Sequence, residues 1–277
     1  MNNVKQSNAK ANSEEERMQA NLDRIKHKLI IISGKGGVGK STVAVNVALG
    51  LAAKGHQVGI LDVDIHGPSI AKMLGIEKKT LMLAKGEEYP KPVQVAKNLY
   101  ALSIATLMPS PDEPIVWRGP LKMGAIKQFL RDINWPPLDY LIIDSPPGTG
   151  DEPLSIIQLL KSVDGSLVVS TPQDVALLDA RKTIKFSQKM NVPVMGLIEN
   201  MSTFICPHCG KKTDIFKGTG VKKAAKDFGL DILGSVPIDA AIVESGDRGS
   251  SFLEKFKENQ SAKEISKIID KIEEKVR

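Results

Sequence analysis

The stretch that most constrains the fold is a glycine-rich loop between an apolar run and a helical pattern. Apolar residues 29–32 lead into Gly34-Lys35-Gly36-Gly37-Val38-Gly39-Lys40-Ser41-Thr42, and small and aliphatic residues fill 43–53. Strand, glycine loop and helix in this order are the context in which G-x-x-x-x-G-K-[ST] indicates a phosphate-binding loop. Backbone N–H groups of such a loop face the anion. We therefore expect these nine residues to bind a nucleotide, with Lys40 on the β- and γ-phosphates and Ser41 on Mg²⁺.

A second lysine, Lys35, directly follows the first glycine of this loop. Two ammonium groups repel each other at short range, so they do not readily share one phosphate. We expect Lys35 to point away from the phosphates that Lys40 binds.

Strand-like and helical patterns alternate along the rest of the chain, which predicts an α/β fold with a doubly wound, mostly parallel β-sheet flanked by helices. The strands are expected at 28–32, 58–62, 99–104, 140–144, 166–170, 194–199 and 231–236. The helices are expected at 40–54, 121–133, 154–161, 175–190 and 221–228. Prolines and a glycine within 80–97 predict a surface loop or a short hairpin.

Bulk composition narrows the class of protein. We expect a flexible polar tail over 1–26 and a single domain over 27–277. No apolar run approaches the roughly 18 residues that span a bilayer. Aromatic residues are 4% of the chain, too few for base-stacking platforms, so no specific nucleic-acid partner is expected. Two cysteines exclude a disulfide framework and favour a cytoplasmic location.

An apolar stripe lies on one face of a predicted helix near the end of the chain, at Ala262, Ile265, Ile268, Ile269, Ile272 and Val276. Such a stripe is typical of a helix that docks on the protein's own core. The alternative is a helix on a membrane surface, but this one lacks aromatic anchors and a basic polar face. We therefore expect no stable membrane association.

Acidic residues follow two of the predicted strands. Asp62 and Asp64 come after 58–62, and Asp144 ends the apolar run 140–144. Ligands of open parallel sheets bind at the carboxyl ends of the strands, so these carboxylates are expected near Mg²⁺ and water. Gly148, shortly after Asp144, is expected to bring its N–H group close to the γ-phosphate.

The two cysteines, Cys206 and Cys209, are separated by two residues and followed by Gly210, which is the spacing of a metal knuckle. Such sites normally need four ligands, and this chain has no second knuckle. His208 is poorly aimed to be a third ligand. The pair is therefore either a redox dithiol or half of a site completed by a second copy of the chain. Four thiolates suit Zn²⁺, [4Fe–4S] or [2Fe–2S], and spacing alone ranks structural zinc first.

The loop with its extra lysine resembles the deviant Walker A ATPases, K-G-G-x-G-K-[ST], a group that includes the Min/Par positioning proteins, the nitrogenase iron protein and the arsenite-pump ATPase. This resemblance implies the P-loop NTPase fold and a homodimer in which Lys35 contacts the nucleotide of the opposite subunit. It implies catalytic roles for Lys35, Lys40 and Asp64, the last orienting the attacking water, with Asp62 and Asp144 near Mg²⁺. It also implies that Asn200 contacts adenine. No guanine-reading Asn-Lys-x-Asp sequence occurs, so ATP is the expected nucleotide.

Segments 62–69, 145–151 and 199–202, together with the cysteine pair, look like the Mrp/ApbC branch of that group. The resemblance implies an iron–sulfur cluster carrier ATPase that holds a bridging [4Fe–4S] cluster through Cys206 and Cys209 of each subunit and transfers it to apo-proteins. The N-terminal four-cysteine motif of some relatives does not occur here. The alternatives are a Min/Par-type positioning ATPase and a nickel- or zinc-handling maturation ATPase with the same dimeric cysteine site.

Overall fold

A computed structural model describes residues 13–65, 67–81, 83, 85–107, 119–206 and 208–276. Within these residues the chain forms a nine-stranded sheet in the order β3-β4-β2-β5-β1-β6-β7-β8, and β9 also pairs with β7. All neighbours run parallel except β3 with β4 and β7 with β8. The strands are β1 (Ile25–Ile32), β2 (Val58–Asp62), β3 (Val93–Ala96), β4 (Leu99–Ser103), β5 (Leu138–Asp144), β6 (Gly165–Ser170), β7 (Val194–Ile205), β8 (Lys212–Thr213) and β9 (Ile232–Ile238). The predicted doubly wound α/β fold is confirmed.

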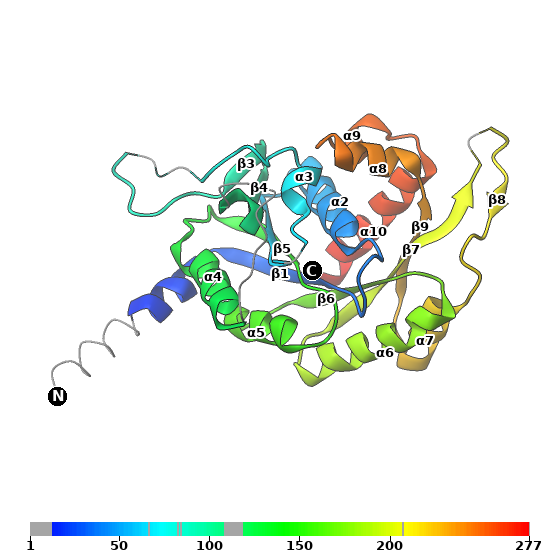
Figure 1. Cartoon of the computed structure of the whole chain (residues 1–277), viewed down its shortest axis with the longest axis horizontal. Coiled ribbons are helices and arrows are strands. Elements are labelled where there is room, and N and C mark those ends of the chain that lie inside the picture. The colour runs from blue at the N-terminus through cyan, green and yellow to red at the C-terminus, as the bar shows by residue number, and fades with distance from the viewer. Residues whose placement is uncertain are drawn as a thin grey trace.

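Helices cover both faces of the sheet (Figure 1). One face packs against α2, α3, α9 and α10, and the other against a helix at 13–22 and α4 to α7. The helices are α2 (Lys40–Ala53), α3 (Ile70–Met73), α4 (Gly119–Asp132), α5 (Asp151–Leu160), α6 (Asp174–Lys189), α7 (Gly220–Phe228), α8 (Ala240–Asp247), α9 (Phe252–Lys255) and α10 (Gln260–Val276), and a 3₁₀ turn spans Ile104–Leu107.

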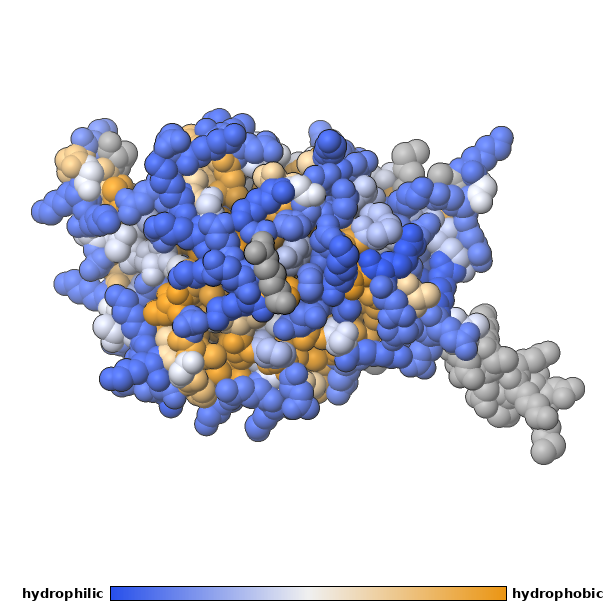
Figure 2. Space-filling view, turned by 180° about the vertical axis from the view of Figure 1, so that it is seen from behind, coloured by the Kyte–Doolittle hydropathy of each residue, from blue (hydrophilic) through white to orange (hydrophobic). Residues whose placement is uncertain are grey.

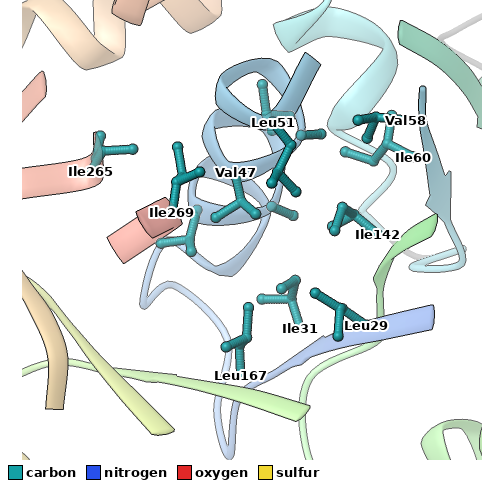
Figure 3. Packing of buried hydrophobic residues seen from close by; sticks show 14 of the residues in the cluster. Leu29, Ile31, Val47, Leu51, Val58, Ile60, Ile142, Leu167, Ile265 and Ile269 are labelled. Atoms are coloured by element: carbon teal, nitrogen blue, oxygen red, sulfur yellow. The ribbon is translucent and has the colours of Figure 1, made fainter. Parts of the chain in front are cut away.

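The second half of strand β1, residues 29–32, is continuously apolar, and its packing shows why. Leu29 and Ile31 belong to the core beneath α2, whereas Ile30 and Ile32 belong to the core on the opposite face. Successive strand residues point to opposite faces, so a strand covered on both sides needs apolar residues at every position. Val47 and Leu51 of α2 pack over this strand (Figure 3). The phosphate loop that joins β1 to α2 is thereby fixed at both ends.

The N-terminal prediction is wrong for the part of the tail that is described. Residues 13–22 are helical, and Met18 and Leu22 are buried. The Asn21 side-chain amide donates to the backbone carbonyls of Leu130, Arg131 and Ile133 at 3.2, 2.8 and 3.0 Å. These carbonyls lie at the C-terminal end of α4, where helix carbonyls lack partners within the helix. Residues 1–12 of the predicted tail lie outside the described residues.

Helix α10 docks on the protein's own core, as the apolar stripe predicted. Five residues of the stripe are buried and Val276 packs partly buried against the same core. The segment 80–97 ends in β3, which forms a short antiparallel hairpin with β4. Among the described residues, no helix has both the length and the apolar character that crossing a bilayer requires. Figure 2 shows hydrophilic residues over much of the face opposite to that of Figure 1.

Candidate functional site: a phosphate loop, a base cavity and a cysteine hairpin

The glycine loop wraps around the start of α2. Gly39 has a φ of 82° and lies directly before the first residue of the helix. A Cβ at Gly39 would lie 2.1 Å from Nδ2 of Asn200, so only glycine fits this approach. The loop lines a cavity of about 250 Å³ together with Lys40, Ser41 and Asp64. The predicted phosphate-loop residues are therefore gathered at the N-terminus of a buried helix, where an anion is favoured.

Lys40 pairs with a carboxylate from another strand. Its Nζ lies 2.6 Å from Oδ1 of Asp144 and 3.8 Å from Oδ2 of Asp64, and the lysine is buried. Burial raises the pKa of Asp144, and the Lys40 ammonium opposes that rise. The second oxygen of Asp144, Oδ2, is buried without a hydrogen-bond partner among the described residues.

Asp62 is fully buried beside Asp144 on the adjacent strand. The Ser103 hydroxyl donates to its Oδ2 at 2.8 Å, and the amide of Asp64 donates to its Oδ1 at 3.1 Å. Burial and the neighbouring Asp144 raise the pKa of Asp62 to about 8. Asp62 therefore holds the turn that carries Asp64.

The oxygens at this point fit Mg²⁺. A buried carboxylate oxygen without a partner costs free energy unless a cation or a donor satisfies it, and Asp144 Oδ2 is such an atom. The Ser41 hydroxyl lies in the same neighbourhood, 3.4 Å from the Lys40 Nζ that binds Asp144. Mg²⁺ prefers oxygen ligands and keeps several waters, so these two side chains suffice as its contacts from the protein.

Two predicted nucleotide contacts have partners within the chain. The Gly148 N–H donates to the carbonyl of Ser33 at 2.8 Å, so it is not free for a γ-phosphate in this conformation. The Lys35 ammonium donates to Oε1 of Gln173 at 3.2 Å. Lys35 and Lys40 thus have different partners, as expected of two lysines that do not share a phosphate.

A second cavity, of about 390 Å³, adjoins the phosphate cavity and shares Thr42, Ser69 and Met73 with it. We call it the base cavity. Further lining residues come from α2, α3, the 200–201 segment, the 216 region, the end of β9 and the chain after it: Val45, Asn46, Leu49, Lys72, Asn200, Met201, Phe216, Pro237, Ile238, Asp239, Ile242, Val243, Ser245, Gly246, Asp247, Ser250 and Phe252. Mostly apolar walls with a few polar groups are typical of a site for a flat heterocycle.

The family resemblance implied that Asn200 contacts adenine, whereas most other walls of this cavity were not predicted. Asn200 lines the cavity, but its Nδ2 donates to the carbonyl of Val38 at 2.8 Å and so also braces the phosphate loop. The residues after β9 could have been found, because the carboxyl end of that strand meets the same edge of the sheet. Phe216 carries no such signal, since it follows the short strand β8.

The cysteine pair lies on a hairpin formed by the end of β7 and by β8, which projects from the body of the protein (Figure 1). Cys206 is half-buried, Cys209 is exposed, and both are free thiols. The Gly210 amide donates to the Cys206 carbonyl at 2.8 Å, with Gly210 at a φ of 68°. Backbone amides of Cys209 and His208 lower the pKa of Cys206 by hydrogen bonding to its sulfur. This turn is suited to holding a metal ion through two thiolates.

Across the part of the chain that the structure describes, no group of three or more His, Cys, Asp and Glu side chains is placed to hold a metal ion. That the cysteine pair is half of a site completed by a second copy of the chain, rather than a redox dithiol, stays a prediction.

The fold and the phosphate site define a P-loop NTPase. Residues 24–273 match the ParA family model, described as NUBPL iron-transfer P-loop NTPase, and the chain belongs to this family. It is 45% identical to an iron-sulfur cluster carrier protein of Methanocaldococcus jannaschii, over 94% of this chain and 88% of the relative. It is 46% identical to an iron-sulfur cluster carrier protein of Saccharolobus solfataricus, over 92% of this chain and 86% of the relative.

Solved structures agree with this assignment. A nucleotide-binding protein of Archaeoglobus fulgidus in complex with ADP, in which Co was found, is 36% identical, with a TM-score of 0.76 over 86% of this chain and 92% of that one. The cell division ATPase MinD of Pyrococcus furiosus is 24% identical, with a TM-score of 0.64 over 90% of this chain and 99% of that one. At that identity the likeness to MinD shows the fold alone.

Proposed function

We propose that this protein is a homodimeric, Mg²⁺-dependent ATPase that binds an iron–sulfur cluster between Cys206 and Cys209 of its two subunits and delivers it to apo-proteins. The observation that carries the proposal is a two-thiol knuckle with no further ligand group beside it among the described residues, on a chain of the iron-transfer NTPase family. Two relatives named iron-sulfur cluster carrier proteins support it. Free thiols need a reducing compartment, and we place the protein in the cytoplasm.

ATP would occupy the two adjoining cavities, with its phosphates against the glycine loop and its base in the base cavity. Lys40 then exchanges Asp144 for the β- and γ-phosphates. When bound, Mg²⁺ neutralises phosphate charge, and Ser41 and Asp144 are the side chains that hold it. Asp64, 3.8 Å from Lys40, is the carboxylate nearest the phosphates that is free to orient a water.

Lys35 supplies the link to a second subunit. It lines the phosphate cavity, and among the described residues its ammonium donates to the neutral side chain of Gln173. An ammonium group with so weak a partner can move to the phosphate of a facing subunit at little cost. A dimer that faces itself across two nucleotides also brings a second cysteine pair, which completes four thiolate ligands.

The cluster is cargo in this scheme. Transfer is an exchange of thiolate ligands on iron: an acceptor thiol loses its proton and binds iron, and a cysteine of the carrier leaves iron and takes a proton. No electron moves, and the number of iron–sulfur bonds is unchanged. The exposed position of Cys209 gives an acceptor access to this step.

The test is anaerobic reconstitution with iron and sulfide, followed by metal, sulfide and mass analysis. We expect about four iron and four sulfide per two chains, as a bridging Cys₄ cluster requires. A Cys206→Ser/Cys209→Ser variant should bind neither and is the matched control. Stoichiometric zinc or nickel without sulfide in the wild-type protein would instead identify a zinc- or nickel-handling ATPase.

A further inference from the structure

The hairpin that carries the cysteines, residues 202–215, is joined in sequence to the body at Met201 and Phe216, and within it Phe204 also pairs with Ile238 of β9. Both attachment residues line the base cavity. The cysteine pair and the nucleotide site are therefore joined by two short segments, one entering the hairpin and one leaving it.

The entering attachment is a bend in β7. Met201 has a φ of 56°, a left-handed conformation that a long side chain rarely adopts. The pairing of β7 with β9 also becomes irregular between Asn200 and Phe204. Before the bend, β7 pairs with both β6 and β9. After the bend, Phe204 pairs with β8 and with Ile238 of β9, and Ile205 pairs with β8. Met201 is thus the point at which the hairpin departs from the sheet.

The leaving attachment is a single aromatic side chain. Every residue from 211 to 219 is exposed except Phe216, which is half-buried. Phe216 lines the base cavity, and it also lines a polar cavity of about 460 Å³ at the root of the hairpin, together with Thr203 and Lys212. Lys212 pairs with Ile205, the residue before Cys206. The side chain that anchors the returning strand therefore stands between the nucleotide site and the cysteines.

We propose that Phe216 is a positioning residue through which the nucleotide base sets the placement of the cysteine hairpin, with Met201 as the bend about which the hairpin turns. A base that enters the base cavity contacts Phe216 directly and fixes the returning strand. This inference rests on the proposed function in taking the base cavity as the site of the nucleotide base and the cysteine pair as the cargo site. Phosphates alone do not reach Phe216, because the phosphate cavity does not include it.

The experiment measures the rate at which iodoacetamide alkylates Cys206 and Cys209 in the reduced, metal-free protein. Three conditions are compared: no ligand, saturating Mg-ADP, and saturating Mg-tripolyphosphate, which has phosphates and no base. We expect Mg-ADP to change the rate by about fivefold, within the range of ordinary allosteric couplings, and Mg-tripolyphosphate to leave it nearly unchanged.

Three variants distinguish a loss of coupling between the base and the hairpin from a loss of nucleotide binding. Phe216→Ala should bring the ratio of rates with and without Mg-ADP to about one at saturation, and Phe216→Leu, which keeps an apolar anchor, should restore part of it. Ile242→Ala removes a side chain from the base cavity on α8, away from the hairpin, so it should weaken Mg-ADP binding and keep the wild-type ratio at saturation.

Three results would overturn the inference: no effect of Mg-ADP on the wild-type protein, an equal effect of tripolyphosphate, or a wild-type ratio in Phe216→Ala. Since no metal is present, none of these outcomes depends on whether the cargo is an iron–sulfur cluster.

Discussion

Nζ of Lys40 lies 2.6 Å from Oδ1 of Asp144, so the lysine of the phosphate loop is bound to a buried carboxylate of its own chain. The pair joins the start of α2 to the end of β5. Under the proposed function, Lys40 leaves this carboxylate to reach a phosphate, and the same departure frees Asp144 for Mg²⁺. The proposed function therefore links nucleotide binding and metal binding through one ion pair.

The first prediction concerns the stability of this pair. Lys40→Ala should lower the free energy of unfolding by about 3 kcal/mol, because it leaves a buried carboxylate without its cation. Adding Asp144→Asn should recover part of the loss. Urea denaturation of the wild type, both single variants and the double variant gives the interaction free energy. Strictly additive effects would show that the two side chains do not interact.

The second prediction is a pH dependence of stability from Asp62, whose pKa is about 8 in the folded protein against 3.8 for the free side chain. Only the folded state holds this proton between those values, so the metal-free protein should lose stability as the pH rises from about 4 to 8. Chemical denaturation at pH 6 and pH 8 measures the loss. Asp62→Asn should remove a large part of it, and an unchanged slope would contradict the assignment.

The third prediction concerns the pH dependence of Mg²⁺ binding. A cation favours ionised carboxylates, so the affinity for Mg²⁺ in the presence of ADP should rise from pH 6 to pH 8 and then level off. Isothermal titration calorimetry with Mg²⁺ at a fixed ADP concentration measures this affinity at each pH. Asp62→Asn should flatten the dependence, whereas Asp151→Asn, at the exposed start of α5, should leave it intact.

The fourth prediction uses two glycines of one loop. Gly39→Ala should destabilise the protein by at least about 1–2 kcal/mol, because φ is positive there and Asn200 occupies the space of a Cβ. Gly36→Ala is the matched control, since a Cβ there meets nothing within 4 Å and φ is not positive. Thermal unfolding of both variants tests this. Equal stability of the two would contradict the described loop geometry.

The fifth prediction tests the docked N-terminal helix. Asn21→Ala removes a donor shared by three carbonyls at the end of α4 and should cost about 1–3 kcal/mol. Gln19→Ala, two residues away, removes a side chain that donates to Asp23 on the surface and should change stability by less than about 0.5 kcal/mol. If residues 13–22 were a solvated tail, both variants would be neutral.

The phosphate loop, the order of strands and helices and the docking of α10 were predictable because each depends on a local pattern. Residues 29–32 of strand β1 are all apolar, and α10 has an apolar stripe. The helix at 13–22 was missed because its apolar residues are few and its stabilising contacts come from α4, more than 100 residues away. β7 was predicted to end at residue 199, but it extends to Ile205. The extension was missed because the extended conformation of residues 200–205 depends on pairing with β8 and β9.

The candidate site was likewise predicted only in part. Lys40, Ser41, Asp64 and Asp144 were predicted together, since motifs at the carboxyl ends of parallel strands meet at one edge of the sheet. The bond of Lys40 to Asp144 was not predicted, because in sequence the lysine has no visible partner other than a phosphate. The base cavity was missed because its walls come from segments as far apart as Thr42 and Phe252.

The central claim, that this ATPase carries a cluster to other proteins, is tested most directly by transfer. Reconstituted protein is mixed anaerobically with an apo-form of a [4Fe–4S] enzyme and Mg-ATP, in the presence of an iron chelator, and recovery of that enzyme's activity is followed. The account predicts recovery with the wild type, slower recovery with Lys40→Ala or Asp64→Asn, and none with Cys206→Ser/Cys209→Ser. Recovery at the wild-type rate with the cysteine double variant would contradict it.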